Sequence, residues 1–319
     1  MIPFDDGIIA AFSAIHSQSS ELSSEFWDAA QQETSSPASN LLFAVRSRFP
    51  LSFLPQLTLL SSSLHNSTKE TIFNYFQTLP TYTQTLQRGF TGYDVMEEEP
   101  DSTLITLKSD LRVFAERDDG EGGVIVQNGT IGRLLSRGES VPTVMWEWPF
   151  NGWALIGRVL ETALMKGVAN VVLDTSFVPV ILEIFRLLEG TLAGSKAAFV
   201  ENVVAATSEE MAQEWDMVSA TYEIVSQVLE VLDVGGARLG EVESLLEIAS
   251  LGIKVLANAV LGQETSIWSL IVKGGSKWWG RISRIGLSAE VLESENLGLT
   301  VDDFTDTVYA SHSGCCRSC

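Results

Sequence analysis

The sequence predicts a mainly α-helical protein that carries one small, inserted β unit. Apolar residues repeat at helical spacing over most of the chain. One Gly-rich stretch, residues 109–161, instead breaks into short runs rich in β-branched and aromatic residues. We therefore expect an irregular α-solenoid, a superhelical array, with a small SH3-like β unit inserted into it.

The predicted β unit is defined by its turns. Residues 118–123 (DDGEGG) and 128–129 (NG) supply the positive φ angles that tight turns need. Val144, Trp146 and Trp148 alternate with polar or flexible residues, which is typical of a strand with one buried face. Four runs have the length of ordinary strands: residues 124–126, 130–135, 143–148 and 153–160.

Three short helices are expected before this unit. Apolar residues at helical spacing predict the first over residues 41–49, with Pro50 ending it. The second covers residues 54–64, where Pro55 fits only the first turn. Residues 67–70 (STKE) have the pattern of a capping box and predict the start of the third. Short connections make the three helices fold back on one another.

Longer helices are expected after the β unit. Residues 177–192 are apolar on most sides, which predicts a helix buried between others. Residues 207–210 (TSEE) form a second capping-box pattern, followed by apolar positions with a spacing of three and four over 211–232. This spacing allows a coiled coil, but a packed helix of an array fits better because charge pairing beside it is not evident. Residues 242–260 predict its antiparallel partner.

The predicted elements divide the chain into four parts. We expect a helical segment over residues 1–100, the SH3-like insertion over 101–161, a solenoid segment over 162–310 and a disordered tail over 311–319. No repeat of fixed length is visible, so the solenoid is irregular.

Composition excludes several classes of protein. The net charge of -21 argues against direct nucleic-acid binding, which depends on clustered Lys and Arg. Asp5 and Asp6 stand where a secretory signal would carry positive charge, and the apolar run 177–188 is too short to span a bilayer. All three cysteines lie in the last five residues, so no disulfide framework is expected and a reducing compartment fits.

No catalytic, cofactor or metal site is predicted. The histidines His16 and His65 are expected at the surface, and the acidic residues of 118–121 lack the alternating ligands of a calcium loop. The tail offers a short zinc-like pattern, but a disordered terminus is the better interpretation. The four residues of that pattern are His312, Cys315, Cys316 and Cys319.

One candidate interaction surface stands out near the C-terminus. Cations and tryptophans gather within a few residues of an otherwise acidic chain, a pattern typical of a helix that docks on an anionic membrane or an acidic partner. Equally, the tryptophans can pack between solenoid helices while the cations face solvent. The candidate surface consists of Trp278, Trp279, Arg281 and Arg284.

Four segments resemble a known family. They are residues 109–119 (SDLRVFAERDD), 129–133 (GTIGR), 144–147 (VMWE) and 157–161 (GRVLE). They look like the N-terminal region of fungal members of the nucleoporin 188 family, very large scaffold proteins of the inner ring of the nuclear pore complex. The chain is several times shorter than those proteins, and we expect it to be a fragment of one.

The resemblance implies a fold and a role. It implies an SH3-like insertion within an α-helical superhelix, in a non-enzymatic scaffold of the nuclear pore complex at the nuclear envelope. Such a scaffold supports nucleocytoplasmic transport of protein and mRNA. The implied partners are other inner-ring nucleoporins, through extended linker segments, and transport receptors. The resemblance implies no cofactor, no direct contact with nucleic acid and, at most, indirect association with the membrane.

A second hypothesis needs no nuclear pore. The chain would then be a soluble HEAT-like adaptor or transport-receptor-type protein whose β unit binds a short motif. The expected recognition face would be formed by Trp146, Trp148 and Trp153.

Overall fold

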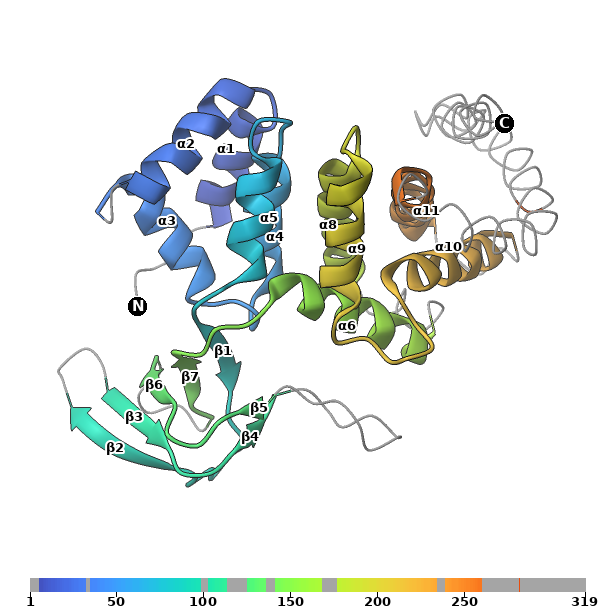
Figure 1. The fold of residues 1–319 in the computed structure, drawn as a ribbon. Coiled ribbons are helices and arrows are strands. Elements are labelled where there is room, and N and C mark those ends of the chain that lie inside the picture. Colours follow the sequence, from blue (N-terminus) through green and yellow to red (C-terminus); the bar gives the residue numbers. More distant parts are fainter. Residues whose placement is uncertain are drawn as a thin grey trace. The chain divides into compact units, whose positions relative to one another are not determined.

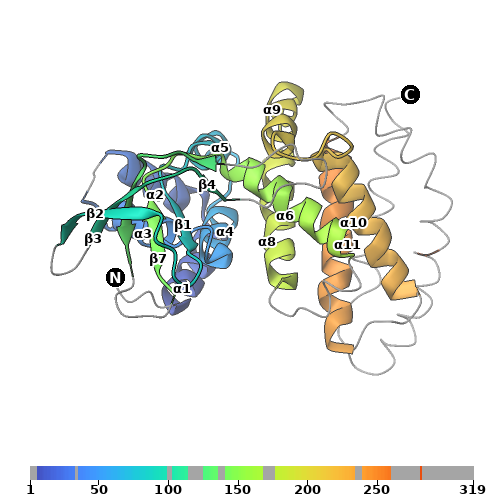
Figure 2. The same cartoon turned by 90° about the horizontal axis from the view of Figure 1, so that it is seen from below.

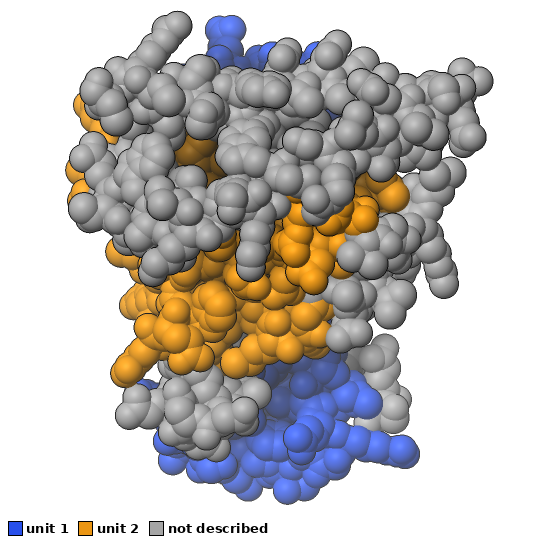
Figure 3. Space-filling view, turned by 90° about the vertical axis from the view of Figure 1, so that its right-hand side faces the viewer, with its two compact units in different colours: residues 1–152 blue, residues 153–319 orange. Residues whose placement is uncertain are grey.

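The structure is a computed structural model, and it describes residues 6–32, 35–98, 103–113, 125–135, 141–167, 177–233, 239–259 and 281. The described part is mainly helical with a small antiparallel sheet, which confirms the predicted mainly-α class (Figure 1). The chain divides into two compact units, residues 1–152 and 153–319, which are coloured separately in Figure 3. Whether the β unit is a domain of its own, with the limits 101–161, stays a prediction.

The first unit begins with a group of short helices. The Ser36 hydroxyl accepts a hydrogen bond from the Ser39 N–H, and Pro37 occupies the first turn that follows, so α3 starts there. Pro55 lies in the first turn of α4, as predicted. The helices are α1 (Asp6–His16), α2 (Ser20–Gln32), α3 (Pro37–Arg46), α4 (Phe53–Ser62) and α5 (Lys69–Gln77).

The predicted capping box before α5 is wrong, although the helix itself is confirmed. Thr68 is the residue that precedes the helix, and its side chain makes no cap bond to the helix. Instead, its hydroxyl accepts from the His65 N–H and donates to the Ser63 carbonyl, which closes the loop between α4 and α5. The Thr68 hydroxyl can hydrogen-bond either to the helix or to the loop, and here its partners are the backbone groups of the loop.

In the described part of the first unit, seven strands follow. Five form one antiparallel sheet in the order β1-β7-β6-β3-β2, and β4 pairs with β5. One face of the sheet has a core of its own, which includes Ile105, Val144 and Trp146. The strands are β1 (Tyr82–Thr85), β2 (Tyr93–Glu98), β3 (Thr103–Leu107), β4 (Leu111–Arg112), β5 (Ile125–Val126), β6 (Ile131–Leu134) and β7 (Thr143–Trp146).

The sequence predicted part of this sheet and missed part of it. The runs 124–126, 130–135 and 143–148 contain β5, β6 and β7. Strands β1 to β4 were missed; in β2, the acidic residues of 97–101 conceal the alternation. The last predicted strand, 153–160, is wrong and lies within α6 (Gly152–Lys166). Its large apolar residues Trp153, Ile156 and Leu160 follow a spacing of three and four and are all fully buried, as in a helix.

The two ends of the β unit meet. Leu79, before β1, and Phe150, after β7, exchange both backbone hydrogen bonds at N–O distances of 2.9 Å. The Phe150 ring also stacks on Phe49 at 6.1 Å, and Gly152 lies against the Phe76 ring of α5. The strands between these ends therefore leave and rejoin the helical part of the first unit at one place.

Removing the strands between these ends should leave the helices folded. We expect a variant that lacks residues 80–149, with Leu79 joined to Phe150 by a short Gly-Ser linker, to keep most of its helical circular dichroism. The reason is that the two joined residues are already hydrogen-bonded neighbours. A deletion of residues 118–149 is the control, because it removes β5 to β7 and exposes the core side of β3. Loss of helical signal in the first variant would show that the helices need the sheet.

The second unit contains the longer helices. The α8 helix matches the predicted helix 177–192 almost residue for residue, and α11 packs along both α8 and α10 (Figure 2). None of the described helices is both long enough and apolar enough to cross a membrane. The remaining helices of this unit are α8 (Val178–Leu192), α9 (Ala197–Ser208), α10 (Met217–Asp233) and α11 (Leu239–Ala259).

The second predicted capping box is also wrong. Thr207 and Ser208 end α9, where their hydroxyls donate to the carbonyls of Val203 and Val204 at 2.8 and 2.7 Å. The α10 helix starts later, after Asp216. There the Ser219 N–H donates to the Asp216 carboxylate and the Asp216 N–H donates to the Ser219 hydroxyl. A reciprocal cap thus exists, but at other residues.

Candidate interaction surfaces

The two described histidines have structural roles. His65 Nε2 lies 2.7 Å from the His16 carbonyl oxygen, and His16 Nδ1 lies 3.3 Å from the Ser23 hydroxyl. The His16 ring also stacks on Phe12, with ring centroids 3.9 Å apart. Burial, together with the nearby His65, lowers the pKa of His16 below its usual value. These contacts tie α1 and α2 to the loop after α4, so neither described histidine is set up as a general base.

No metal site is found in the part of the chain that the structure describes. There, no three side chains of His, Cys, Asp or Glu gather closely enough to hold a metal ion. The residues His312, Cys315, Cys316 and Cys319 lie outside the described residues.

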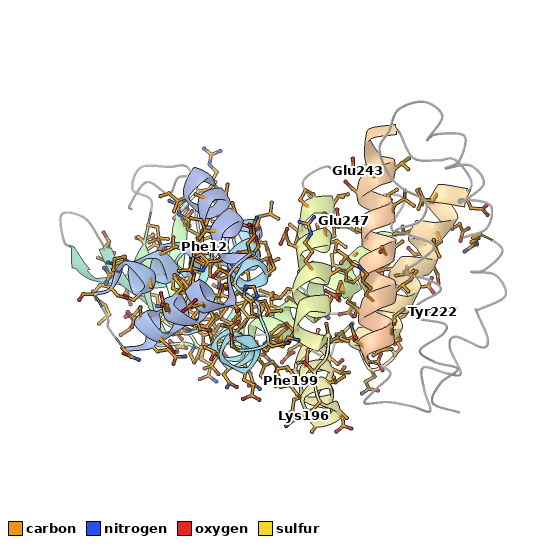
Figure 4. All side chains as sticks on the ribbon, turned by 90° about the horizontal axis from the view of Figure 1, so that it is seen from above. Phe12, Lys196, Phe199, Tyr222, Glu243 and Glu247 are labelled. Carbon is orange, nitrogen blue, oxygen red and sulfur yellow. The ribbon has the colours of Figure 1, made fainter. Side chains whose placement is uncertain are left out.

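An ionic cluster joins two helices of the second unit. Arg186 of α8 donates to Glu247 of α11 through Nε and Nη2, at 3.1 and 2.5 Å, and to Glu183 through Nη1 at 2.5 Å. Figure 4 shows Glu247 on the side of α11 that faces α8. A guanidinium that holds two carboxylates fixes how the two helices lie against each other more firmly than a single ion pair does.

One member of the C-terminal candidate surface is described. Arg281 donates to the Ser226 carbonyl at 3.3 Å and to the Glu230 carboxylate at 3.1 Å, so its side chain lies along the outer side of α10. Its side chain is 22% exposed. Trp278, Trp279 and Arg284 lie outside the described residues. Arg281 thus contacts a glutamate of its own chain, and the use of the surface for a partner stays a prediction.

The tryptophan face expected under the adaptor hypothesis is wrong. Trp146 and Trp153 are fully buried, the first in the core of the sheet and the second on α6. Trp148 packs between Tyr82 and Phe150, each ring centroid 5.9 Å away. Trp146 and Trp153 therefore stabilise the fold, and the partly buried Trp148 does not form the expected three-residue face alone.

Sequence reasoning missed one surface, the outer edge of β2. This strand stands at the end of the five-stranded sheet, and its Val95 and Met96 are 51% and 60% exposed. The alternation of Tyr93 and Val95 was a usable signal, but the acidic residues that follow concealed it.

The described structure is that of a mainly helical protein with a small β-sheet that has a core of its own. Residues 143–275, which include β7 and all five helices α6 and α8 to α11, match the family model "Nucleoporin Nup188, N-terminal subdomain III". The chain is also similar to nucleoporin nup184 of Schizosaccharomyces pombe, with 28% identity over 150 residues. That match covers 43% of this chain and 9% of the relative.

Both matches are to nucleoporins of the Nup188 kind, which confirms the resemblance seen in the sequence. The chain spans less than a tenth of the length of the relative it matches. Similarity to nuclear pore proteins agrees with the expected localisation at the nuclear pore complex and with a structural rather than an enzymatic role.

Proposed function

We propose that this chain is part of a structural scaffold of the nuclear pore complex and supports nucleocytoplasmic transport of protein and mRNA. It does so by holding other inner-ring nucleoporins, whose extended linker segments lie along its helices, and it can also meet transport receptors. Neither nucleic acid nor the membrane is a direct partner in this proposal, since the chain carries a net charge of -21.

A single observation carries the proposal. The match to the Nup188 family model covers the described helices α6 and α8 to α11 together with the last strand of the sheet. We infer that this unit is a segment of an irregular solenoid and that the sheet is an SH3-like insertion before it. A solenoid presents extended surfaces because each helix pair contacts only its neighbours, which suits the binding of long, extended segments.

The ion pairs of the second unit support such a role. A scaffold has to keep the orientation of its helices while partners bind and dissociate. Arg186 links α8 to α11 through Glu247, and Arg281 lies against Glu230 of α10. These contacts fix the orientation of the helices and do not line a cleft, which fits a structural protein. The surface of Trp278, Trp279, Arg281 and Arg284 remains a candidate docking site for an acidic partner.

Localisation tests the proposal. We expect a fluorescently tagged copy of the full chain, expressed in fission yeast beside a tagged inner-ring nucleoporin, to give a punctate nuclear rim that survives detergent extraction. Free fluorescent protein is the control. A diffuse signal would contradict the proposal for this chain. A pull-down from the same cells that recovers soluble partners would then support the adaptor hypothesis.

A further inference from the structure

The turn between β5 and β6 contains a chemically reactive pair of residues. Asn128 is followed directly by Gly129, and both residues are exposed. Glycine has no side chain, so it shields its own backbone nitrogen less than any other residue does. That nitrogen can therefore reach the side-chain carbonyl carbon of a preceding asparagine, which is the first step of spontaneous deamidation. The pair is thus a candidate modification site as well as a turn.

Hydrogen bonds hold this turn in one conformation. The Thr130 N–H donates to the Gln127 carbonyl at 3.2 Å, and the Thr130 hydroxyl donates to the same oxygen at 2.7 Å. Gly129 has a φ of 85°, in the left-handed region that favours glycine at the third position of a tight turn. The direction of the Gly129 nitrogen is therefore fixed by the turn.

The reactive nitrogen is engaged while the sheet is folded. The Gly129 N–H donates to the Leu107 carbonyl of β3 at 2.8 Å, and the Asn128 N–H donates to a carboxylate oxygen of Asp110 at 2.8 Å. Deamidation requires that the Gly129 nitrogen lose its proton and turn toward the Asn128 side chain. Both changes break the bond to Leu107, which costs free energy. The fold therefore opposes a reaction that the sequence permits.

We propose that Asn128 is a site of spontaneous deamidation that reacts when the strands around the turn open. In the open state, the Gly129 nitrogen forms a bond to Cγ of Asn128, and the bond from Cγ to the amide nitrogen breaks. The amide group leaves as ammonia and takes with it the proton of the Gly129 nitrogen, so a five-membered succinimide ring remains. Water then adds to one of the two ring carbonyls and opens the ring, which leaves aspartate or isoaspartate at position 128.

The product fits the turn less well than asparagine does. Aspartate adds a negative charge to the residue whose own N–H binds the carboxylate of Asp110, and like charges repel. Isoaspartate also inserts a methylene group into the backbone, which displaces the hydrogen bonds of Gly129 and Thr130. The modification is therefore one-way and records that the sheet has opened. This proposal rests on the turn alone and does not depend on the proposed role at the pore.

Mass spectrometry of the full chain measures the reaction. Trypsin cleaves after Arg117 and Arg133 and releases a peptide in which Asn128 is the sole asparagine, so the second Asn-Gly pair, at residues 151–152, does not contribute. The synthetic peptide of residues 118–133 is the unfolded reference. At neutral pH we expect the folded chain to lose the Asn128 amide at least tenfold more slowly than this peptide, because the small population of open sheet limits the rate.

Two variants test whether opening of the sheet controls the rate. Trp146→Ala removes a fully buried side chain opposite Gly132 of β6, so it should raise the rate at least tenfold toward that of the peptide. The control, Glu147→Gln, changes the exposed residue that follows and should stay within threefold of the unmodified chain.

Urea provides a test that needs no variant. At concentrations below those that unfold the helices, urea should raise the deamidation rate of the unmodified chain in step with the loss of the near-ultraviolet circular dichroism of the sheet.

Three results would overturn the proposal. They are a folded chain that reacts as fast as the peptide, a peptide in which Asn128 keeps its amide, and a rate that neither Trp146→Ala nor urea raises. Each of these results concerns the turn between β5 and β6. None of them bears on the localisation experiment, so the two proposals fail separately.

Discussion

Replacing Gly157 by alanine should lower the free energy of unfolding of the second unit by about 3 kcal/mol, the upper end of the usual cost of overpacking. A Cβ at this position of α6 would lie 2.0 Å from the Thr207 carbonyl oxygen of α9 and 3.0 Å from Met211 Cγ. The first of these obstacles is backbone, which cannot move aside like the end of a side chain. The gain in helix propensity from glycine to alanine, about 1 kcal/mol, offsets only part of this cost.

Urea unfolding followed by circular dichroism at 222 nm measures the effect of Gly157→Ala. Thr162→Ala, on the exposed side of the same helix, is the matched control. It removes a hydroxyl that donates to the Arg158 carbonyl, and it should change the free energy of unfolding by less than about 0.5 kcal/mol. Equal stability of the two variants would mean that α6 and α9 do not cross as closely as the structure has them.

Truncating Trp146 to alanine should destabilise the sheet by about 4 kcal/mol, a typical cost for removing a fully buried aromatic side chain. Gly132, its partner on β6, leaves the space that the indole fills. A Cβ at Gly132 would lie 2.5 Å from Cε3 of that ring. Gly132→Ala should therefore also destabilise the sheet, by about 2 kcal/mol.

The two substitutions should not add. Without the indole, the methyl group of Gly132→Ala meets only Val144 Cγ1, at 2.8 Å, so the double variant should lose less stability than the sum of the two single costs. Near-ultraviolet circular dichroism during urea unfolding provides the four free energies of this cycle. Ile131→Ala, at a partly exposed position of the same strand, is the control and should cost less than about 1 kcal/mol. Additive costs would show that Trp146 does not lie over Gly132.

The sequence predicted those elements whose signals are local. Pro55 placed the start of α4, and the long apolar pattern before Leu192 placed α8 within a residue. The run from Trp153 was assigned to a strand because its composition is typical of strands, although its period is that of a helix. For this run, the residue composition indicated a strand and the spacing of apolar residues indicated a helix. The spacing was the better guide, because the buried residues follow it.

Features that depend on distant partners were beyond the sequence. Strand β1 consists of only four residues, and it is a strand because β7, about sixty residues later, pairs with it. The open edge of β2 is likewise a property of the strand order rather than of the residues. The charge of Arg281 made it a candidate for an interaction surface. Its ion pair with Glu230 of α10 depends on the tertiary structure and could not be predicted from the sequence.

The pairing of Leu79 with Phe150 has a consequence for how the protein responds to force and heat. Because the sheet begins and ends at one place, it forms a closed loop that is joined to the helices there and, through Thr83, at Phe49 and Pro50. If the strands melt, roughly seventy residues become a slack loop whose closure costs only slightly more entropy than a shorter one would. The melting of the strands therefore need not propagate into the helices.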